Sequence, residues 1–250
     1  MNPRQHCQEI IAAIGAAETV EARWPIVARL LGHMGIDQIN YGTFGTGDRE
    51  TADVRFLSTM RPDWIAYYGD KRLDLDDPHV TLVRHNNLTP YRWSEEAVRR
   101  LDAGRAKDVA QLSAEAGLRS QWQVTLPDMD GSPVPVAGMA LGSSLPARDF
   151  AGILEGNEAA LVTIAHLFHH CSIREVRRAH AGVPRLSPRE RDALTFVADG
   201  RRIDRIAGLM GLARVTVEMH LRGARRKLKA RTLPEAVAKA IHFGELKLGY

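Results

Sequence analysis

Residues 186–237 read LSPRERDALTFVADGRRIDRIAGLMGLARVTVEMHLRGARRKLKARTLPEAV, and this stretch decides the fold of the C-terminal quarter of the chain. Its first helix is predicted to begin at a capping box, with Ser187 as the N-cap, a proline after it and Glu190 at the third helical position. Gly200 is expected to end that helix. A second capping-box pattern begins at Thr232 and predicts the start of a fourth helix.

Two further helices are expected between these ends, joined by the three-residue turn 211–213. The first places its apolar residues at i, i+3, i+4 and i+7, which is one face of a helix: Ile203, Ile206, Ala207 and Met210. The second, about 214–229, divides into an apolar face and a basic face at roughly 100° per residue. Its apolar face consists of Val217, Leu221, Ala224 and Leu228. Its outer face contains Arg214, Arg222, Arg225, Arg226 and Lys229, with Glu218 among them.

A short helix, a tight turn and a helix with a basic outer face form the arrangement that docks in a DNA major groove. The alternative is a small helical interaction domain whose charged face is simply solvated. The charge distribution favours DNA, because residues 184–250 carry 15 Lys and Arg against 7 Asp and Glu, a net charge of +8. The preceding 183 residues carry 19 basic and 23 acidic residues, a net charge of −4. Only the C-terminal part is therefore expected to bind phosphates.

The chain of 250 residues is long enough for two domains, each with its own core. We expect a ligand-binding domain over residues 1–175, a linker over 176–185 and the DNA-binding domain over 186–250. No apolar run has the length of a signal peptide core or a membrane span. Cys7 and Cys171 have neither a metal-binding nor a disulfide spacing, so a reducing cytoplasm is the expected compartment. We expect the protein to use no metal and no cofactor and to have no membrane partner.

The N-terminal part mixes helices and strands without a repeating βαβ pattern. Strands are expected at Ile36–Phe44, Val54–Leu57, Trp122–Leu126 and Val134–Leu141, and a long helix at Phe150–Ile173. Helices are also expected at about 5–14, 21–33, 62–71, 78–85, 94–101 and 107–116. The predicted fold class is α+β, with an N-terminal α/β/α sandwich around an antiparallel sheet and a C-terminal all-α four-helix helix-turn-helix domain.

Aromatic side chains with polar tips are concentrated in residues 60–93. Trp64 and Tyr68 are four residues apart and share a helix face, Asp77 precedes another helix, and Trp93 follows. Such a set can line an apolar pocket in which a few polar groups orient a ligand. The residues alone also allow a plainer interpretation, in which the aromatics are core and the aspartate is an N-cap.

These two segments carry a resemblance to a known family. The C-terminal motifs L-S-P-R-E, I-A, T-V-x-x-H and K-L resemble the DNA-binding domain of the LuxR family of quorum-sensing regulators. Segment 60–93, through Trp64, Tyr68, Asp77-Pro78 and Trp93, resembles the autoinducer-binding domain of the same family. The resemblance extends over nearly the whole chain, and it implies a ligand of the N-acyl homoserine lactone class.

The resemblance implies a role for each pocket residue. Trp64 would donate its indole N–H to the lactone carbonyl, and Tyr68 would donate its hydroxyl to the acyl carbonyl. Asp77 would accept the amide N–H, and Trp93 would pack on the lactone ring. Tyr67 is a rival for Tyr68, but its side chain points about 100° away on a helix.

The chain departs from the family's pattern at two pocket positions. Gln121 stands where the family has a glycine, and Ala137 takes the place of a serine or threonine on the strand that faces the pocket. A larger group on the sheet and a lost hydroxyl leave the acyl part of the ligand open. They are compatible with a shorter pocket, with an aryl acyl group, or with activity that needs no ligand.

On the DNA side, Ala213 replaces the usual serine cap before the third helix. Glu218 is expected either to accept from cytosine or to pair with Arg214 or Arg222 four residues away, and Arg222 is suited to guanine. Val215, on the same stretch, is also a candidate for DNA contact. The remaining candidates for DNA contact, chiefly to phosphate, are Arg189, Arg214, Thr216, Arg225, Arg226 and Lys227.

We therefore expect a transcription factor that binds promoter DNA with twofold symmetry as a homodimer, and no catalytic residues. The apolar stripes of Phe150–Ile173 and of the last helix are available for self-pairing. Two alternatives remain: a DNA-binding protein that needs no ligand, and a lactone-processing enzyme. For the enzyme, neither a G-x-S-x-G elbow nor an H-x-H-x-D metal motif is present. The cluster around His166, His169, His170 and Cys171 suggests either a metal site or helix-interface residues.

Overall fold

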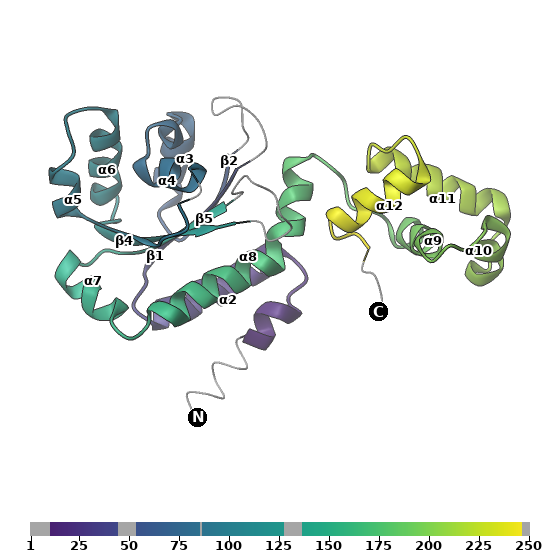
Figure 1. Ribbon diagram of the computed structural model, residues 1–250, viewed down its shortest axis with the longest axis horizontal. Coiled ribbons are helices and arrows are strands. Elements are labelled where there is room, and N and C mark those ends of the chain that lie inside the picture. The colour runs from purple at the N-terminus through teal and green to yellow at the C-terminus, as the bar shows by residue number, and fades with distance from the viewer. Residues whose placement is uncertain (1–10, 45–53, 86, 128–136, 247–250) are drawn as a thin grey trace. The chain divides into compact units, whose positions relative to one another are not determined.

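The computed structural model describes residues 11–44, 54–85, 87–127 and 137–246, and the chain divides into two compact units, Met1–Ile173 and Arg174–Tyr250. Each unit has its own secondary structure, which Figure 1 shows in chain order. The division lies inside one helix, α8, which runs from Glu158 to His180.

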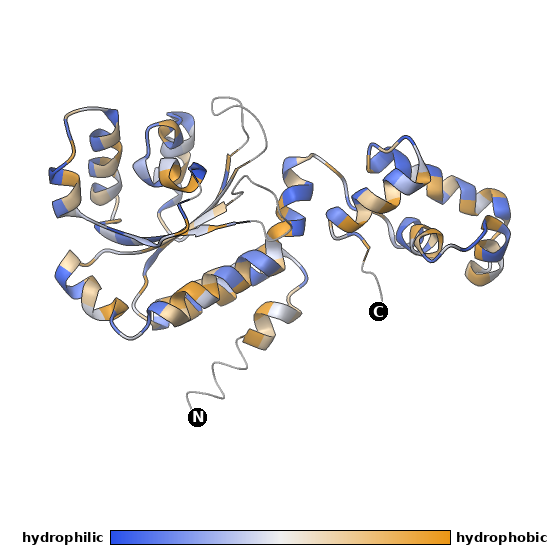
Figure 2. Ribbon diagram, viewed as in Figure 1, coloured by the Kyte–Doolittle hydropathy of each residue, from blue (hydrophilic) through white to orange (hydrophobic). Residues whose placement is uncertain are grey.

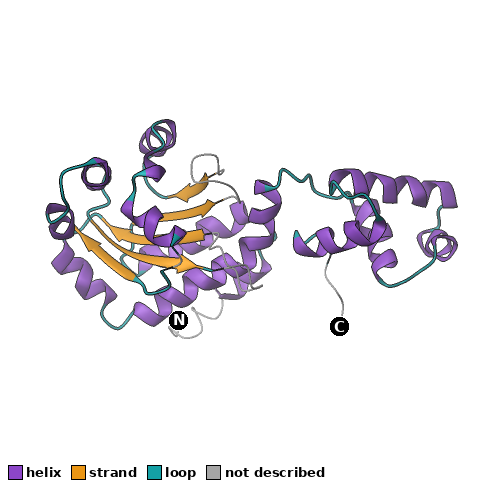
Figure 3. Ribbon diagram, turned by 45° about the horizontal axis from the view of Figure 1, so that its top comes forward, coloured by secondary structure: helices purple, strands orange, loops and turns teal. Residues whose placement is uncertain are grey.

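The N-terminal unit is built on a five-stranded antiparallel sheet in the order β2-β1-β5-β4-β3, drawn in orange in Figure 3. The strands are β1 (Gln38–Phe44), β2 (Val54–Ser58), β3 (Tyr91–Ser94), β4 (Ser120–Leu126) and β5 (Ala137–Ser143). Every residue of β4 and β5 is buried, because helices cover both faces of the sheet.

One group of helices covers one face of this sheet, and a second group covers the other (Figure 1). The first group comprises α3 (Pro62–Asp70), α4 (Pro78–Arg84), α5 (Glu95–Arg99) and α6 (Arg105–Glu115). The second comprises α2 (Val20–His33), α7 (Ala147–Leu154) and the part of α8 that belongs to this unit. On the second side Tyr41 of β1 meets Phe168 of α8 edge to face, with ring centroids 5.0 Å apart. The α/β/α sandwich is confirmed.

Two local predictions for this unit need correction, and two others extend into residues outside the described part. The helix expected over Phe150–Ile173 is two helices, α7 and α8, because Gly156 between them adopts a left-handed conformation with φ +77°. The short strand β3 was assigned to no element. The strand expected from Val134 begins at Ala137 among the described residues, and residues 134–136 lie outside them. Of the helix expected at 5–14, residues 11–16 are helical and 5–10 lie outside the described part.

In the described part of the C-terminal unit, the four predicted helices pack around one apolar core. They are α9 (Pro188–Ala198), α10 (Ile203–Met210), α11 (Arg214–Lys227) and α12 (Leu233–His242). Each is apolar on one face and polar on the other, as the alternating colours of Figure 2 show. The Ser187–Glu190 capping box is complete. At the start of α12, Thr232 caps the helix, but the Glu235 carboxylate accepts from the backbone N–H of Arg231 instead of from the cap residue.

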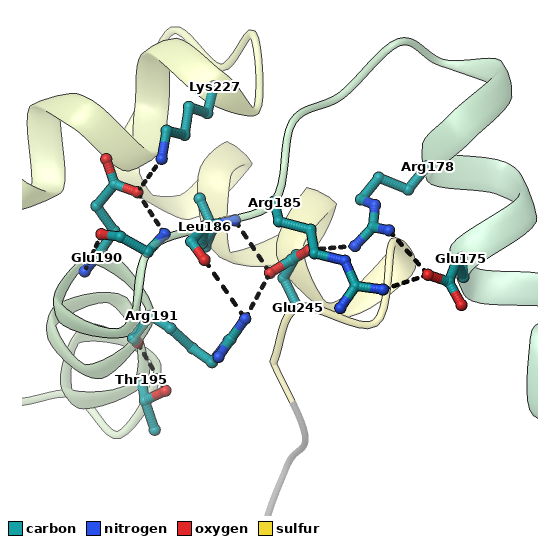
Figure 4. Close-up of polar contacts among 10 residues, drawn as sticks. Glu175, Arg178, Arg185, Leu186, Glu190, Arg191, Thr195, Lys227 and Glu245 are labelled. Atoms are coloured by element: carbon teal, nitrogen blue, oxygen red, sulfur yellow. Dashed lines mark hydrogen bonds and ion pairs between the residues drawn. The ribbon is translucent and has the colours of Figure 1, made fainter. Parts of the chain in front are cut away.

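The segment expected as a linker is partly helical, since α8 continues to His180 and only then gives way to a loop. Glu245, buried after α12, ties this segment to the C-terminal unit (Figure 4). It accepts from Arg178 at 2.7 Å, from Arg191 at 3.2 Å and from the backbone N–H of Leu186 at 3.2 Å. Residues 178–186 are therefore held against the helical domain by charge-assisted bonds.

The apolar stripes expected to mediate self-pairing are used within the chain. In α8, Leu161, Ala165 and Phe168 are fully buried. In α12, Ala236 and Ala240 are fully buried in the core of the C-terminal unit. An amphipathic helix packs its apolar face on its own domain core first, so sequence stripes of this kind do not by themselves indicate a dimer surface.

Candidate functional site

A cavity lies between the sheet of the N-terminal unit and the helices α3, α4 and α6. Its walls are mostly apolar, and a few polar side chains reach it. The described residues that line it are Asn40, Gly42, Phe44, Phe56, Met60, Trp64, Ile65, Tyr68, Asp77, His79, Val80, Val83, Ser113, Leu118, Gln121, Gln123, Gly138 and Ala140. A concave apolar space with a small number of polar groups is the usual form of a small-molecule site.

Tyr68 and Asp77 are hydrogen-bonded to each other at this cavity. The Tyr68 hydroxyl donates to Asp77 Oδ2 at 2.7 Å, and the backbone N–H of His79 donates to Oδ1 at 2.8 Å. Asp77 is therefore both the N-cap of α4 and a cavity group. Burial, followed by the neighbouring Asp77 carboxylate, raises the pKa of Tyr68 well above its usual value, so the phenol remains a donor.

Trp64 lies one turn before Tyr68 on α3 and lines the same cavity. Their rings meet edge to face, with centroids 6.1 Å apart, in a cluster that includes Met60 and Leu73. Tyr67, the rival position, is 44% exposed, whereas Tyr68 is 8% exposed. The helix thus turns Trp64 and Tyr68 inward and Tyr67 outward, as the helical period predicts.

The two remaining predicted pocket residues do not line the cavity. Trp93 is buried behind His79, whose ring it meets edge to face at 4.8 Å, so that it supports the wall. Ala137 is fully buried but does not line the cavity. The cavity is lined from this strand by Gly138 and Ala140, which share the opposite strand face. Adjacent strand residues point to opposite faces, so the expectation for Ala137 is displaced by one position.

Gly138 sets how closely α4 approaches the sheet. A Cβ at this position would lie 2.5 Å from Cγ2 of Val83 and 2.7 Å from Nε2 of Gln123. A side chain at this position would have to displace Val83 and Gln123, so the serine or threonine that the family resemblance led us to look for on this strand would fit at Gly138 only if these neighbours moved.

Three amide side chains lie on the floor of the cavity, of which Gln121 was expected at the pocket and Asn40 and Gln123 were not predicted. Asn40 and Gln123 lie opposite Ala140 from the two neighbouring strands, in one row across the sheet. Gln121 lies two residues before Gln123 on the same strand face and is 2% exposed. The available signal was the alternation of polar residues at 121 and 123 in a buried strand, where apolar residues are the rule.

The second candidate site is the outer face of α11, the third helix of the C-terminal unit. Ala213 precedes it in an extended conformation and provides no side-chain cap, as expected. Arg214 bonds to Glu218 at 3.0 Å and to Asp204 of α10 at 3.0 Å. Of the two expectations for Glu218, the structure contains the pair with Arg214. Both side chains are exposed, so the pair is open to exchange with a DNA group.

Lys227 and Arg225 have partners inside the protein. Lys227 Nζ lies 2.6 Å from Glu190 Oε2, the carboxylate of the capping box of α9 (Figure 4). Burial raises the pKa of Glu190, but the bonds from Lys227 and Ser187 outweigh it and the net pKa is lowered. Arg225 donates to the backbone carbonyl of Arg231. The structure thus places Lys227 in a role that holds α9 against α11, not on the outer face.

Most of the other residues predicted to contact DNA are exposed. Arg189, Arg222 and Arg226 are exposed, and Thr216 is half-buried. Two large apolar side chains also face solvent on α11, Val215 at 71% exposure and Met219 at 56%. Val215 was among the residues predicted to contact DNA, and Met219 was not. The outer face therefore combines exposed cations with apolar contacts, which suits phosphates and base edges together.

The histidines of α8 have separate environments. His169 is buried, and its Nδ1 lies 2.9 Å from the Tyr41 hydroxyl on the face of the sheet away from the cavity. No group of three metal-ligating side chains occurs among the residues that the structure describes. None of the described helices has the length and apolar character needed to cross a membrane.

Comparison with known proteins covers both sites. Residues 19–172 match the family of autoinducer binding domains, and residues 184–240 match the bacterial regulatory proteins of the luxR family. The chain is 24% identical to the transcriptional activator protein CarR of Pectobacterium carotovorum subsp. carotovorum, over 84% of this chain and 87% of that protein. It is 29% identical to the quorum sensing-dependent transcriptional regulator RpaR of Rhodopseudomonas palustris, over 74% of this chain and 72% of that protein.

Solved structures share the fold. The N-acylhomoserine lactone dependent LuxR family factor CepR2 of Burkholderia cenocepacia is similar with a TM-score of 0.57 and 19% identity, over 69% of this chain and 94% of that one. Escherichia coli SdiA is similar with a TM-score of 0.51 and 16% identity, over 98% of this chain and 100% of that one. The chain belongs to the LuxR family of quorum-sensing transcriptional regulators, with an autoinducer-binding domain followed by a DNA-binding helix-turn-helix domain.

Proposed function

We propose that this regulator binds an N-acyl homoserine lactone in the cavity of its N-terminal unit and binds symmetric promoter DNA as a homodimer. The observation that carries the proposal is the convergence of Trp64, Tyr68 and Asp77 on one largely apolar cavity. A homoserine lactone amide presents two carbonyl acceptors and one N–H donor. An indole, a phenol and a carboxylate are the complementary set.

The bond between Tyr68 and Asp77 defines how the head of the ligand enters. The ligand N–H takes the place of the phenolic proton on the Asp77 carboxylate, and the Tyr68 hydroxyl turns to the acyl carbonyl. Trp64 donates to the lactone carbonyl, and Trp93 acts through His79 instead of on the ring itself. Asp77 remains the cap of α4 throughout, because its Oδ1 keeps the backbone N–H of His79.

For DNA, α11 enters the major groove with Arg222 and the apolar pair Val215 and Met219 toward base edges. Arg189 and Arg226 bind phosphates. Two copies of this domain related by a twofold axis bind half-sites about 10 base pairs apart. The ligand changes DNA affinity only if it binds one arrangement of the protein more tightly than another.

The test is titration of the full chain with homoserine lactones of increasing acyl length, followed by native mass spectrometry. We expect one lactone per chain, and Tyr68→Phe to weaken binding about tenfold through loss of one buried hydrogen bond. Tyr67→Phe is the matched control, since this exposed neighbour on the same helix should leave binding unchanged. Indifference of the wild-type chain to every lactone would refute the sensor function.

The two alternatives are distinguished in the same experiment. An enzyme would return the lactone with its ring opened, a gain of one water in mass. A regulator that needs no ligand would bind DNA equally with and without lactone in a gel-shift assay. Equilibrium sedimentation of the protein–DNA complex tests the homodimer, for which two chains per symmetric site are expected.

A further inference from the structure

The cavity contains polar atoms that the lactone head does not use. Oε1 of Gln121 and Nδ1 of His79 are buried and have no hydrogen-bond partner among the described residues. Both residues line the cavity. An unpaired buried polar atom is costly to a protein, and such atoms in a native fold are usually satisfied by something that binds there.

Gln121 is the more informative of the two. It is 2% exposed, and the register of the sheet places it between Trp93 of β3 and Gly142 of β5. Gly142 offers no polar side chain, and the Trp93 ring packs on His79. The other amides on the same floor have partners. Asn40 bonds to Ser58 and Met60, and Gln123 donates to the backbone carbonyl of Val124.

The chemistry of the unpaired atom defines its partner. A carbonyl oxygen of an amide only accepts, so the missing group is a hydrogen-bond donor. The head of a homoserine lactone has one N–H, and the proposed function assigns it to Asp77. On the remaining acyl group the available donor is a hydroxyl.

We propose that Gln121 forms a polar subsite for a hydroxyl on the acyl group of the signal, so that this regulator prefers hydroxylated acyl homoserine lactones over their unsubstituted and keto counterparts. The inference rests on the proposed lactone site and adds the class of acyl group. A keto group accepts and cannot satisfy Oε1, so it should gain nothing over a methylene. A site built for a hydroxyl discriminates against the analogue without it, because its own polar group is then left unpaired.

The test uses matched ligand pairs that differ in one oxygen. Calorimetric titration of the full chain compares 3-hydroxyacyl, 3-oxoacyl and unsubstituted acyl homoserine lactones of six to twelve carbons. A second series compares 4-hydroxyphenylacetyl with phenylacetyl homoserine lactone. We expect the hydroxylated member of at least one series to bind about tenfold more tightly. In Gln121→Leu the ratio should fall to about one, and in Gln123→Leu it should persist.

Each outcome decides the inference separately from the proposed function. If lactones bind but the wild-type chain shows no hydroxyl preference, or prefers the keto compounds, the inference is wrong and the lactone site stands. If the preference survives in Gln121→Leu, or is lost in Gln123→Leu instead, Gln121 is not the subsite. If no lactone binds at all, the proposed function itself fails. If the Gln121→Leu chain does not fold, the wild-type ratios still decide whether the cavity prefers a hydroxylated acyl group, and the Gln123→Leu ratio still decides whether Gln123 is responsible.

Discussion

The cavity of the N-terminal unit and the outer face of α11 differ in how far their polar groups are buried and paired. In the cavity the polar groups are few and buried, and Oε1 of Gln121 has no described partner. On α11 the charges are many and exposed, and Arg214 is already paired with Glu218. Buried groups without partners discriminate strongly between ligands, whereas exposed pairs exchange partners at little cost. We therefore expect the cavity to discriminate between ligands, and the helix face to attract DNA with an affinity that depends on salt.

The largest effect is expected for a substitution of a buried polar group at the cavity. Asp77→Ala removes the cap of α4 and leaves the Tyr68 hydroxyl buried without its acceptor. Loss of the cap and of a charged buried hydrogen bond should together lower the free energy of unfolding of the N-terminal unit by about 2–4 kcal/mol. Urea unfolding followed by tryptophan fluorescence measures this unit alone, since all four tryptophans lie before residue 174.

Asp76→Ala is the control for that prediction. Asp76 is the adjacent carboxylate, and its partner Arg105 at 2.6 Å is mostly exposed. A loss below about 1 kcal/mol is expected for such a pair. Equal losses for the two variants would contradict the special role of Asp77 as a buried acceptor.

The second prediction concerns the other face of the same sheet, where His169 Nδ1 is hydrogen-bonded to the Tyr41 hydroxyl. Burial, helped by His166 and His170, lowers the pKa of His169 to about 4 from an unfolded value of 6.5. The folded state holds this ring neutral, so its contribution is complete above pH 6.5 and is lost as the pH falls toward 4. Between pH 7.5 and pH 5 the unfolding free energy of the N-terminal unit should fall by about 2 kcal/mol from this group.

His169→Gln supplies the comparison, because a glutamine amide does not titrate and still offers an acceptor to the Tyr41 hydroxyl. Fluorescence-detected urea unfolding at several pH values should show a weaker pH dependence for the variant than for the wild-type chain. Parallel pH profiles would mean that other groups cause the acid sensitivity.

The third prediction compares a paired cation with an exposed one in the C-terminal unit. Lys227→Met removes a cation that is 28% exposed and leaves Glu190 with only its capping bonds. We expect a loss of about 1–2 kcal/mol in the stability of this unit, measured by circular dichroism, because breaking a partly buried pair strands its partner. The slope of DNA affinity against salt should change little. Arg222→Met, at an exposed position of the same helix, should leave stability unchanged within about 0.5 kcal/mol.

Local signals predicted the elements of the fold that depend on neighbouring residues. The box at Ser187, the uncapped start after Ala213 and the inward turn of Trp64 and Tyr68 follow from spacing along one helix, and the structure contains each of them. The antiparallel sheet was also predicted from the sequence, because apolar strands that do not alternate regularly with helices rarely form a parallel sheet.

Features that depend on distant parts of the chain were missed. Whether residue 137 or 138 faces the cavity depends on which side of the sheet α4 packs, and a shift of one residue reverses every side chain. The role of Lys227 depends on Glu190, 37 residues away. The break between α7 and α8 was missed for a different reason. Gly156 and Asn157 are local indicators of a helix end, but the apolar stripe that continues on both sides of them favoured a single helix.

The smallest effect tests the helix face by itself. Arg226 is exposed on α11 one position before Lys227. If it binds phosphate, Arg226→Gln should weaken binding similarly for all DNA sequences and reduce the slope of log affinity against log salt by about 1. Stability of the C-terminal unit should not change, which is the reverse of the Lys227→Met result. Fluorescence anisotropy at several salt concentrations measures both variants. An unchanged slope for Arg226→Gln would place this cation outside the DNA interface and leave Arg189 as the proposed phosphate contact.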